Sequence, residues 1–254
     1  MDAEEYRSYC KEFRSVERYL RSKSADTRTV NYNICKLRRY DENQMSSILE
    51  EAGFLFIEDD SVYEPLEGNV PDELGLFKNG KFLLRGRFIF PVRDMLGNTI
   101  AMIGWFPDEK KYVTTPSKLF SKSCLFYGME QLGMHGLGGN YYLCEGIFDT
   151  LSVRSLGIRA IGNMGITYSR VKGELYSIFG NLIGVPDNDT QGRSVLSGDK
   201  WKLRSTDKYL RWIGEEAVGI KDIDDLIREY EPDEIRDCLL SSFNSSDRVV
   251  NIEL

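Results

Sequence analysis

The chain has 254 residues, of which 41% are apolar and 12% aromatic, and its formal net charge is −7. This size and composition are typical of a folded protein with a sizeable core, built as one large domain or two smaller ones. No run approaches the roughly 18 apolar residues of a membrane helix, and the charged N-terminus is unlike a secretory signal, so we expect a cytoplasmic protein without membrane contacts.

The cysteine and histidine content argues against disulfides and structural zinc. The five cysteines are widely spaced, no CxxC pair occurs, and His135 is the single histidine. Disulfide frameworks and zinc sites need paired cysteines or several Cys and His ligands in close pairs. We therefore expect no zinc in this chain.

Charge is unevenly distributed along the chain. Residues 110–122 contain four lysines and no acid, and residues 192–211 contain six basic residues against two acidic ones, whereas acids concentrate after residue 214. Local potential, rather than net charge, steers a nucleic acid toward a protein. A basic face for a polyanion is therefore compatible with the acidic total, although such runs are also common as plain solvated surface.

In the first half of the chain, apolar spacings of three and four predict amphipathic helices over 4–22 and 42–54. Residues 87–94 and 95–105 then read as two strands, and the Leu96-Gly97-Asn98 turn between them predicts a hairpin.

In the second half, the glycine-rich stretch 133–140 reads as a linker and the pattern changes after it. Short apolar strands are predicted at 141–145, 158–162, 181–186 and 217–220, with helices between them at 147–156 and about 168–178 and a last one from 222. Strands that alternate with helices predict an α/β fold with a parallel sheet flanked by helices. In such sheets the chemistry lies at the carboxyl ends of the strands.

Acidic residues follow three of these predicted strands. They are Glu145 and Asp149 after the first, Asp187 and Asp189 after 181–186, and Asp222, Asp224 and Asp225 after 217–220. Like charges gathered at one sheet edge are unfavourable without a cation, and oxygen ligands alone favour Mg²⁺ or Mn²⁺ over zinc. Each acid by itself also has a structural explanation, since Asp149 suits the first turn of a helix and Asp222 suits an N-cap.

These acidic segments, EGIFD, PDNDTQGR and KDIDD, resemble the three signature motifs of the TOPRIM domain. This metal-binding module is shared by DnaG-type primases, type IA and type II topoisomerases and some nucleases. The resemblance covers about residues 140–230. Upstream, RFIFPVRDMLGNTIAMIGW and KKYVTTPSKLFSKSCLFYG are similar to the segment that precedes TOPRIM in DnaG-type primases, in order and in spacing.

The resemblance implies a mixed α+β N-terminal subdomain of a primase core at 1–136, a TOPRIM domain at 137–230 and a short acidic tail at 231–254. It implies a DNA primase catalytic core that synthesises short RNA primers from NTPs on single-stranded DNA by metal-dependent nucleotidyl transfer. The expected cofactor is Mg²⁺ or Mn²⁺, and the expected partners are the template, NTPs and the RNA primer.

The resemblance also assigns roles to residues. Glu145, Asp187 and Asp189 are the expected catalytic residues, and the expected metal ligands are these three with Asp222 and Asp224. Asp149 is expected to orient its neighbours without binding the metal itself. Glu145 is a candidate both for proton acceptor and for metal ligand. Contacts to nucleic-acid or nucleotide phosphates are expected from Arg87, Arg93, Lys111 and Lys122.

The chain departs from the family pattern in three ways. Gly104-Trp105-Phe106 stands where family members usually have an arginine, no zinc ribbon is present, and only 30 residues follow Asp224. We therefore expect a pared-down core of the kind found in phages or mobile elements, with a separate zinc-ribbon subunit and a replicative helicase as candidate partners. A TOPRIM nuclease and a non-catalytic nucleic-acid-binding replication subunit remain alternatives.

Overall fold

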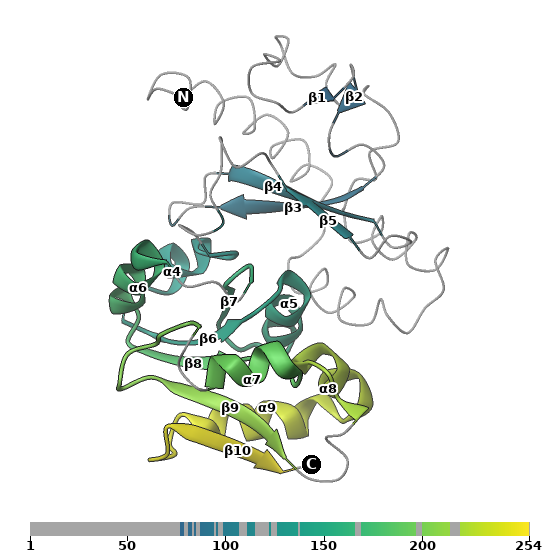
Figure 1. The fold of residues 1–254 in the computed structure, drawn as a ribbon. Helices are drawn as coiled ribbons and strands as arrows, with labels where there is room; N and C mark the ends of the chain where they lie inside the picture. The colour runs from purple at the N-terminus through teal and green to yellow at the C-terminus, as the bar shows by residue number, and fades with distance from the viewer. Residues whose placement is uncertain are drawn as a thin grey trace. The chain divides into compact units, whose positions relative to one another are not determined.

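A computed structural model describes residues 77–78, 81–82, 84, 87–93, 95, 99–106, 111–114, 122, 126–136, 138–165, 169–196, 200–213 and 219–253. The described residues up to Lys122 belong to one compact unit, and those from Phe126 onward belong to a second (Figure 1). The helices expected at 4–22 and 42–54 lie outside the described residues. None of the described helices combines the length and the hydrophobicity needed to cross a membrane.

The first unit contains antiparallel strands. β1 (Phe77–Lys78) pairs with β2 (Lys81–Phe82), and a three-stranded sheet has the order β3-β4-β5. The bounds of its strands are β3 Phe88–Arg93, β4 Thr99–Phe106 and β5 Lys111–Thr114. The predicted hairpin is confirmed by the antiparallel pairing of β3 with β4, which shifts register between Val92 and Arg93. The turn expected at residues 96–98 lies outside the described residues.

The second unit, here called the sheet domain, is built on five parallel strands in the order β10-β9-β8-β6-β7 (Figure 1). The strands are β6 Asn140–Cys144, β7 Ala160–Gly162, β8 Asn181–Val185, β9 Lys208–Ile213 and β10 Val249–Glu253. The helices are α4 Glu130–His135, α5 Ile147–Ser155, α6 Arg170–Leu175, α7 Thr190–Leu196, α8 Ile223–Glu229 and α9 Pro232–Ser242, with a short 3₁₀ helix at Tyr176–Ile178. The predicted α/β class with a parallel sheet is confirmed.

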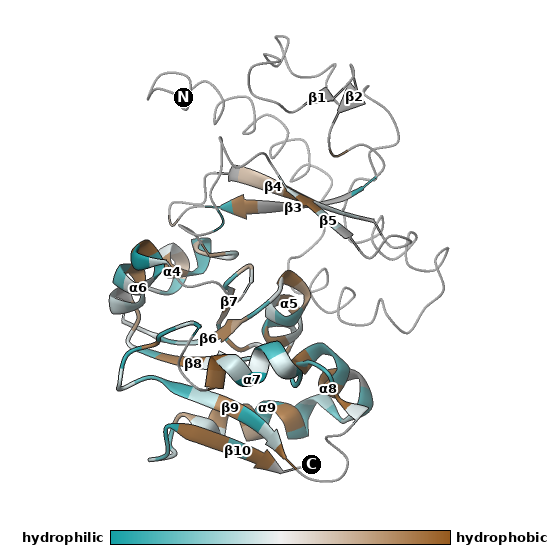
Figure 2. Ribbon diagram, viewed as in Figure 1, coloured by the Kyte–Doolittle hydropathy of each residue, from teal (hydrophilic) through white to brown (hydrophobic). Residues whose placement is uncertain are grey.

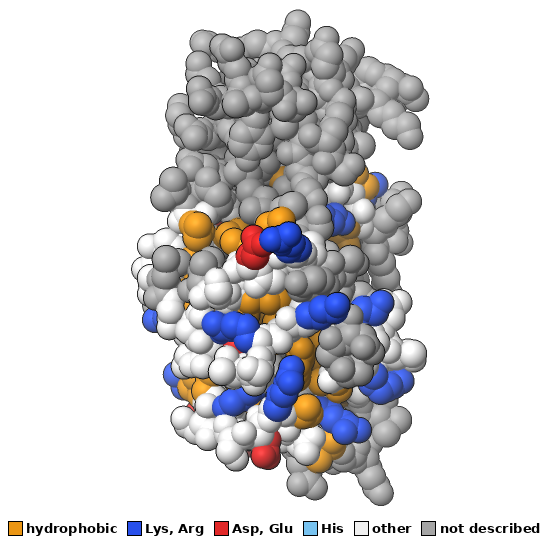
Figure 3. Space-filling model, turned by 60° about the vertical axis from the view of Figure 1, so that its left-hand side comes forward, with side chains coloured by type: hydrophobic (Ala, Val, Ile, Leu, Met, Phe, Trp, Pro, Cys, Tyr) orange, Lys and Arg blue, Asp and Glu red, His pale blue; other side chains and the backbone are white. Residues whose placement is uncertain are grey.

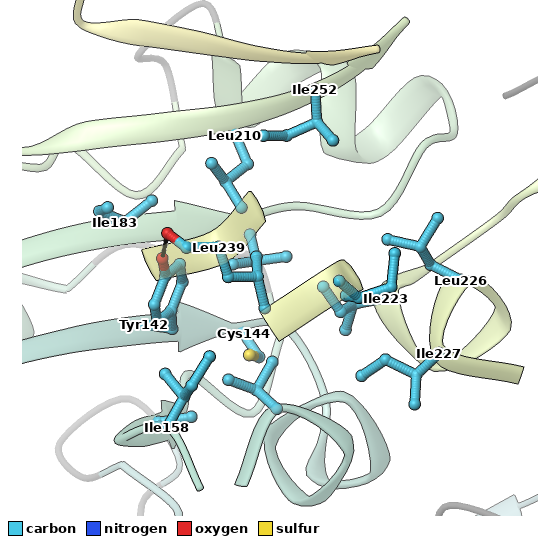
Figure 4. Packing of buried hydrophobic residues seen from close by; sticks show 14 of the residues in the cluster. Tyr142, Cys144, Ile158, Ile183, Leu210, Ile223, Leu226, Ile227, Leu239 and Ile252 are labelled. Carbon is cyan, nitrogen blue, oxygen red and sulfur yellow. Dashed lines mark hydrogen bonds between the residues drawn. The ribbon is translucent and has the colours of Figure 1, made fainter. Parts of the chain in front are cut away.

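Both faces of this sheet are buried, because its central strands β6 and β8 are buried at every position after their first residue. Tyr142 and Ile183 point to the side covered by α5, α8 and α9, as Figure 4 shows. Tyr141 and Leu182 belong to the opposite cluster, which includes the fully buried Trp201. Such two-sided burial explains why these strands read as continuous apolar runs rather than as alternating ones.

Two local predictions were wrong. Residues 133–135 belong to α4 and not to a linker, although the glycines that follow them do connect this helix to β6. A strand was expected at 217–220, but the described residues Gly219 and Ile220 are not in a strand. The fourth strand of the parallel sheet in chain order is instead β9 at Lys208–Ile213. Charged Lys208 and Arg211 obscured this strand in the sequence, because they stand before and within the run of its buried residues Tyr209, Leu210 and Trp212.

The C-terminal residues also differ from the expected acidic tail. α9 begins with Pro232 at its first turn, where a missing N–H costs nothing, and β10 pairs with β9. Leu239 and Ile252 join the core cluster, and Figure 2 shows β10 as hydrophobic along most of its length. The buried Tyr142 hydroxyl hydrogen-bonds the Leu239 carbonyl and lies 2.8 Å from the Ser242 hydroxyl. Residues 232–253 are therefore part of the sheet domain.

Leu239 and Leu240 provide a matched test of this packing. Leu239 is 1% exposed and Leu240 is 40% exposed. We expect Leu239→Ala to lower the free energy of unfolding by about 2–5 kcal/mol, since it leaves a cavity in the core. Leu240→Ala should change it by less than about 0.5 kcal/mol. Urea unfolding measures both, and equal losses would contradict the assignment of α9 to the core.

Candidate active site at the carboxyl edge of the sheet

Glu145 follows β6 and is held toward the neighbouring strand. Its Oε1 accepts the backbone N–H of Asp187, at the end of β8, at 3.2 Å. Gly146 is the N-cap of α5 and donates its N–H to Asp149 Oδ2 at 3.1 Å. A Cβ atom on residue 146 would lie 2.6 Å from that oxygen, so a larger residue here would displace the Asp149 carboxylate. Asp149 thus fixes the start of α5 immediately behind Glu145.

Asp189 shapes the end of β8. Its Oδ1 accepts the backbone N–H groups of Gln191 and Gly192, both at 2.8 Å. This satisfies donors that the first turn of α7 otherwise leaves unpaired. A Cβ atom on Gly192 would overlap with the Asp187 carbonyl, so glycine here lets the turn fold back onto the helix.

Asn188 connects this turn to the third acidic motif. Its N–H donates to the Lys221 carbonyl at 2.6 Å, and its side-chain amide donates to the Ile220 carbonyl at 3.0 Å. The sequence analysis did not single out Asn188. Its only signal was its place between Asp187 and Asp189.

The third motif begins at Lys221 and Asp222. Asp222 is the N-cap of α8 and accepts the N–H of Asp225 at 2.9 Å. Lys221 Nζ lies 3.8 Å from Asp187 Oδ2 and 3.9 Å from Asp222 Oδ2. The side chain of Lys221 therefore links two of the acidic motifs. The sequence analysis missed it, although a lysine directly before three aspartates signals charge compensation.

Asp224 lies away from the open edge. It is 2% exposed, and its Oδ1 accepts the hydroxyl of Ser152 in α5 at 2.7 Å. Asp224 and Asp149 thus both make hydrogen bonds that fix α5. Glu145, Asp187 and Asp189 are partly exposed at the carboxyl edge, whereas Asp222 is 3% exposed and caps α8.

The electrostatics of this edge centre on Glu145. Burial raises its pKa from 4.5 to about 7, the negative charges of Asp187 and Asp189 add to the rise, and the Asp187 N–H and Lys221 oppose it. A carboxyl group with this pKa exchanges protons near neutral pH. The same crowding of negative charge is what a bound cation would relieve.

The acidic edge fits a divalent cation that prefers oxygen ligands. Over the described residues, no three His, Cys, Asp or Glu side chains form a closed ligand set. Mg²⁺ commonly binds through one or two carboxylates, with water and substrate phosphates completing its coordination. Glu145, Asp187, Asp189 and Asp222 stay predicted ligands, of which one or two could bind such an ion together with water and substrate phosphates.

The turn after β7 borders the same edge. Asn163 donates its N–H to the Cys144 carbonyl at 2.8 Å, and Gly165 donates to the Glu145 carbonyl at 3.0 Å. Lys172 of α6 is 2% exposed, hydrogen-bonds the Asn163 carbonyl and lies 5.2 Å from the centre of the Phe126 ring. This buried lysine, which the sequence analysis also missed, holds the turn beside Glu145.

The four basic residues expected to contact phosphates belong to the first unit. Arg87 and Arg93 are half-buried and Lys122 is exposed, while Lys111 begins β5. A Cβ atom on Gly104 would lie 2.9 Å from Arg87 Cδ. Arg87 thus extends along the position where a side chain of residue 104 would stand. The phosphate contacts of these four residues stay predictions.

The raised pKa of Glu145 predicts a pH-dependent stability. The folded protein binds the proton of the Glu145 carboxyl group more tightly than the unfolded chain does. Binding this proton therefore stabilises the folded state at low pH, and the stabilisation is lost as pH rises from 4.5 to about 7. Without divalent cations, the loss from Glu145 should reach about 2 kcal/mol, less than the rise of its pKa alone corresponds to, because solvent screens the charges around this half-buried group. Glu145→Gln lacks this proton and should lose correspondingly less, as denaturant titrations across this pH range would measure. Parallel losses in both proteins would contradict the prediction.

The close contact at Gly192 predicts a second outcome. Gly192→Ala should lower the free energy of unfolding by about 1–3 kcal/mol, because the added methyl displaces the Asp187 carbonyl. Gln191→Ala is the control, since it alters an exposed side chain on the same turn of α7. Thermal or urea unfolding compares the two, and an unchanged stability of Gly192→Ala would show that the turn has room to move.

Comparisons with known proteins agree with this architecture. A family described as Toprim-like matches residues 142–227. The DNA primase of Deinococcus radiodurans is 31% identical over 137 residues, a match that covers 48% of this chain and 24% of that protein. The DNA primase of Clostridium acetobutylicum is 28% identical over 116 residues, covering 44% and 20%. The matches thus span about a quarter or less of these primases.

Solved structures resemble the chain over most of its length. A DnaG primase catalytic domain bound to single-stranded DNA has a TM-score of 0.67 at 20% identity and covers 92% of this chain and 79% of its own. The RNA polymerase domain of the Mycobacterium tuberculosis primase DnaG has a TM-score of 0.62 at 20% identity and covers 89% and 80%. At this identity the likeness establishes the fold.

Proposed function

We propose that this chain, a Toprim-like domain within the fold of DnaG-type primase catalytic cores, joins NTPs into short RNA primers on single-stranded DNA. The observation that carries the proposal is the acidic carboxyl edge, where Glu145 lies against Asp187 and Asp189. The sequence similarity to two DNA primases supports it.

The proposed reaction forms one phosphorus–oxygen bond and breaks another. The 3′-hydroxyl of the primer attacks the α-phosphorus of an incoming NTP, and pyrophosphate leaves. The hydroxyl proton must be removed. Glu145 is the candidate acceptor, since its pKa lies at about 7 and the Asp187 N–H fixes the orientation of its carboxylate.

Mg²⁺ or Mn²⁺ at this edge would lower the pKa of the attacking hydroxyl and neutralise the leaving pyrophosphate. The proposed ligands are Asp187 and Asp189, with Asp222 beside them, and Glu145 is a third ligand as the alternative to its role as proton acceptor. Asp224 joined the ligands in the sequence-based prediction, but its hydrogen bond to Ser152 supports a positioning role instead. Lys221 keeps the carboxylates of Asp187 and Asp222 close together before substrate enters.

The proposed template and NTP contacts lie in the first unit, where Arg87, Arg93, Lys111 and Lys122 would bind phosphates as fixed positive charges. A separate zinc-ribbon subunit and a replicative helicase are proposed partners. A related Aquifex aeolicus primase structure, with a TM-score of 0.58 at 19% identity, contains zinc-binding and RNA polymerase domains. Work on a DNA template would place the protein in the cytoplasm.

Asp187→Asn tests the proposal while preserving side-chain shape. We expect primer synthesis from labelled NTPs on single-stranded DNA with Mg²⁺ or Mn²⁺ to fall by at least about 100-fold, since the variant loses a proposed ligand and the charge next to Glu145. Asp233→Asn is the control, because Asp233 is an exposed acid in the first turn of α9. Its activity should equal that of the wild type.

The same assay separates the other chemistries that an acidic edge supports. Shortening of labelled nucleic acid without NTPs, lost in Asp187→Asn, would indicate a nuclease. Binding of nucleic acid with neither product, even when partner proteins are added, would indicate a non-catalytic replication subunit. Either result would replace the primase proposal.

A further inference from the structure

The amino-terminal edge of the sheet, opposite the acidic edge, carries mostly basic residues. Among the described residues of the loops that lead into the strands, together with the first residue of β9, six are basic and two are acidic. The basic ones are Arg159 before β7, Lys200, Lys202 and Arg204 before β9, Lys208 at its start, and Arg248 before β10.

Strand register places these residues along one line. Tyr142 pairs with Ala160, Ile183 with Lys208, and Tyr209 with Val249. Arg159, Lys208 and Arg248 therefore stand at the same end of their strands. Neighbouring strands lie about 4.8 Å apart, so the four steps from β7 to β10 span about 19 Å.

The two acidic residues at this edge offset two of its six positive charges, and one of them is paired with Arg204. Asp207 is 1% exposed, accepts two hydrogen bonds from Arg204 at 2.6 and 2.9 Å and accepts the Leu182 N–H at 3.1 Å. Asp247 is the other acid, and it is exposed. Figure 3, seen from the side where α4 and α6 lie in Figure 1, shows many lysine and arginine side chains and few acidic ones.

Several of these side chains are held in place. The Arg159 guanidinium lies 6.0 Å from the centre of the Tyr141 ring, and a Cβ atom on Gly139 would meet its Nη1 at 2.6 Å. Arg204 donates to the Phe179 and Gly180 carbonyls at 3.0 and 3.1 Å, and Lys208 Nζ donates to the Ser242 and Phe243 carbonyls at 3.3 and 2.7 Å. These two side chains are engaged within the protein, so Arg159, Lys200, Lys202 and Arg248 are the candidates to meet a ligand. Side chains that are ordered before binding lose less entropy when a ligand arrives. Arg159, Lys202 and Arg248 are exposed.

We propose that this amino-terminal edge binds the sugar–phosphate backbone of single-stranded nucleic acid, as a second contact surface apart from the acidic edge. A row of basic residues about 19 Å long matches a strand of regularly spaced phosphates. An acidic protein segment would also complement the positive charge of this edge, but a protein partner would need an apolar core at the interface as well. The exposed large hydrophobic residues of the described chain are Met95, Tyr112, Met134, Val171 and Leu240, and none lies in these loops.

The inference deepens the proposed function and rests on it, because a primase core must retain its template strand while primers are made. Contact at the amino-terminal edge would hold template that extends beyond the acidic edge. It adds affinity without taking part in bond formation, so variants here alter binding and leave the acidic edge intact.

The test measures binding of a fluorescein-labelled single-stranded oligonucleotide to the full chain, without NTPs or divalent cations, over a range of salt concentrations. Each phosphate contact adds about 0.7 to the slope of log binding constant against log salt concentration. The variant Arg159→Gln/Lys202→Gln should therefore bind more weakly, with a slope smaller by about 1.4. Each single variant should show about half of this change.

Arg236→Gln is the control, because Arg236 is exposed on α9, outside these loops. Unchanged slopes in the edge variants, an equal decrease in Arg236→Gln, or no binding by the wild type would each overturn the proposal. A slope unchanged for DNA but reduced for a poly-glutamate peptide would overturn it in favour of a protein partner. Primer synthesis is scored separately, so priming with unchanged slopes refutes only this inference, whereas reduced slopes without priming refute only the proposed function.

Discussion

Backbone N–H groups of one short turn hold the acidic edge together against the repulsion of its own charges. Asp187 donates to Glu145 on one side, and Asn188 donates to the Lys221 carbonyl on the other. The turn thereby joins the ends of two neighbouring strands to the start of α8. Glycine at 192 lets the turn come this close to α7. Without these bonds, the buried carboxylate of Glu145 would have few compensating contacts.

The parallel sheet then separates charge along its strands. All five strands run in one direction, so every loop after a strand lies at one edge and every loop before a strand lies at the other. The acids Glu145, Asp187 and Asp222 gather at the first edge, and Arg159 and Arg248 lie at the second. A chain with net charge −7 can therefore present separate surfaces for a cation and for phosphates.

The packing also depends on residues late in the chain. α9 covers the sheet face that contains Tyr142. The Leu239 carbonyl accepts a hydrogen bond from the Tyr142 hydroxyl, although the two residues are 97 positions apart in the sequence. β10 completes the sheet beside β9. Residues 231–254 were predicted to be a short acidic tail, because acids are frequent among them. The apolar residues Ile235 and Leu239 lie on one face of α9, and Val250 and Ile252 lie on one face of β10. These short patterns become clear only when the core they pack against is known.

The order of residues was enough to predict the fold class, the antiparallel hairpin at β3 and β4, and the strands β6, β7 and β8, because continuous apolar runs bounded by glycine, proline and acids leave few alternatives. It also identified the acids that follow these strands. The folded chain was needed to show that Asp224 turns to Ser152, that Lys221 lies near both Asp187 and Asp222, and that Lys172 is buried against the Asn163 carbonyl. Such roles depend on distances between segments remote in sequence, and no local pattern of residues encodes those distances.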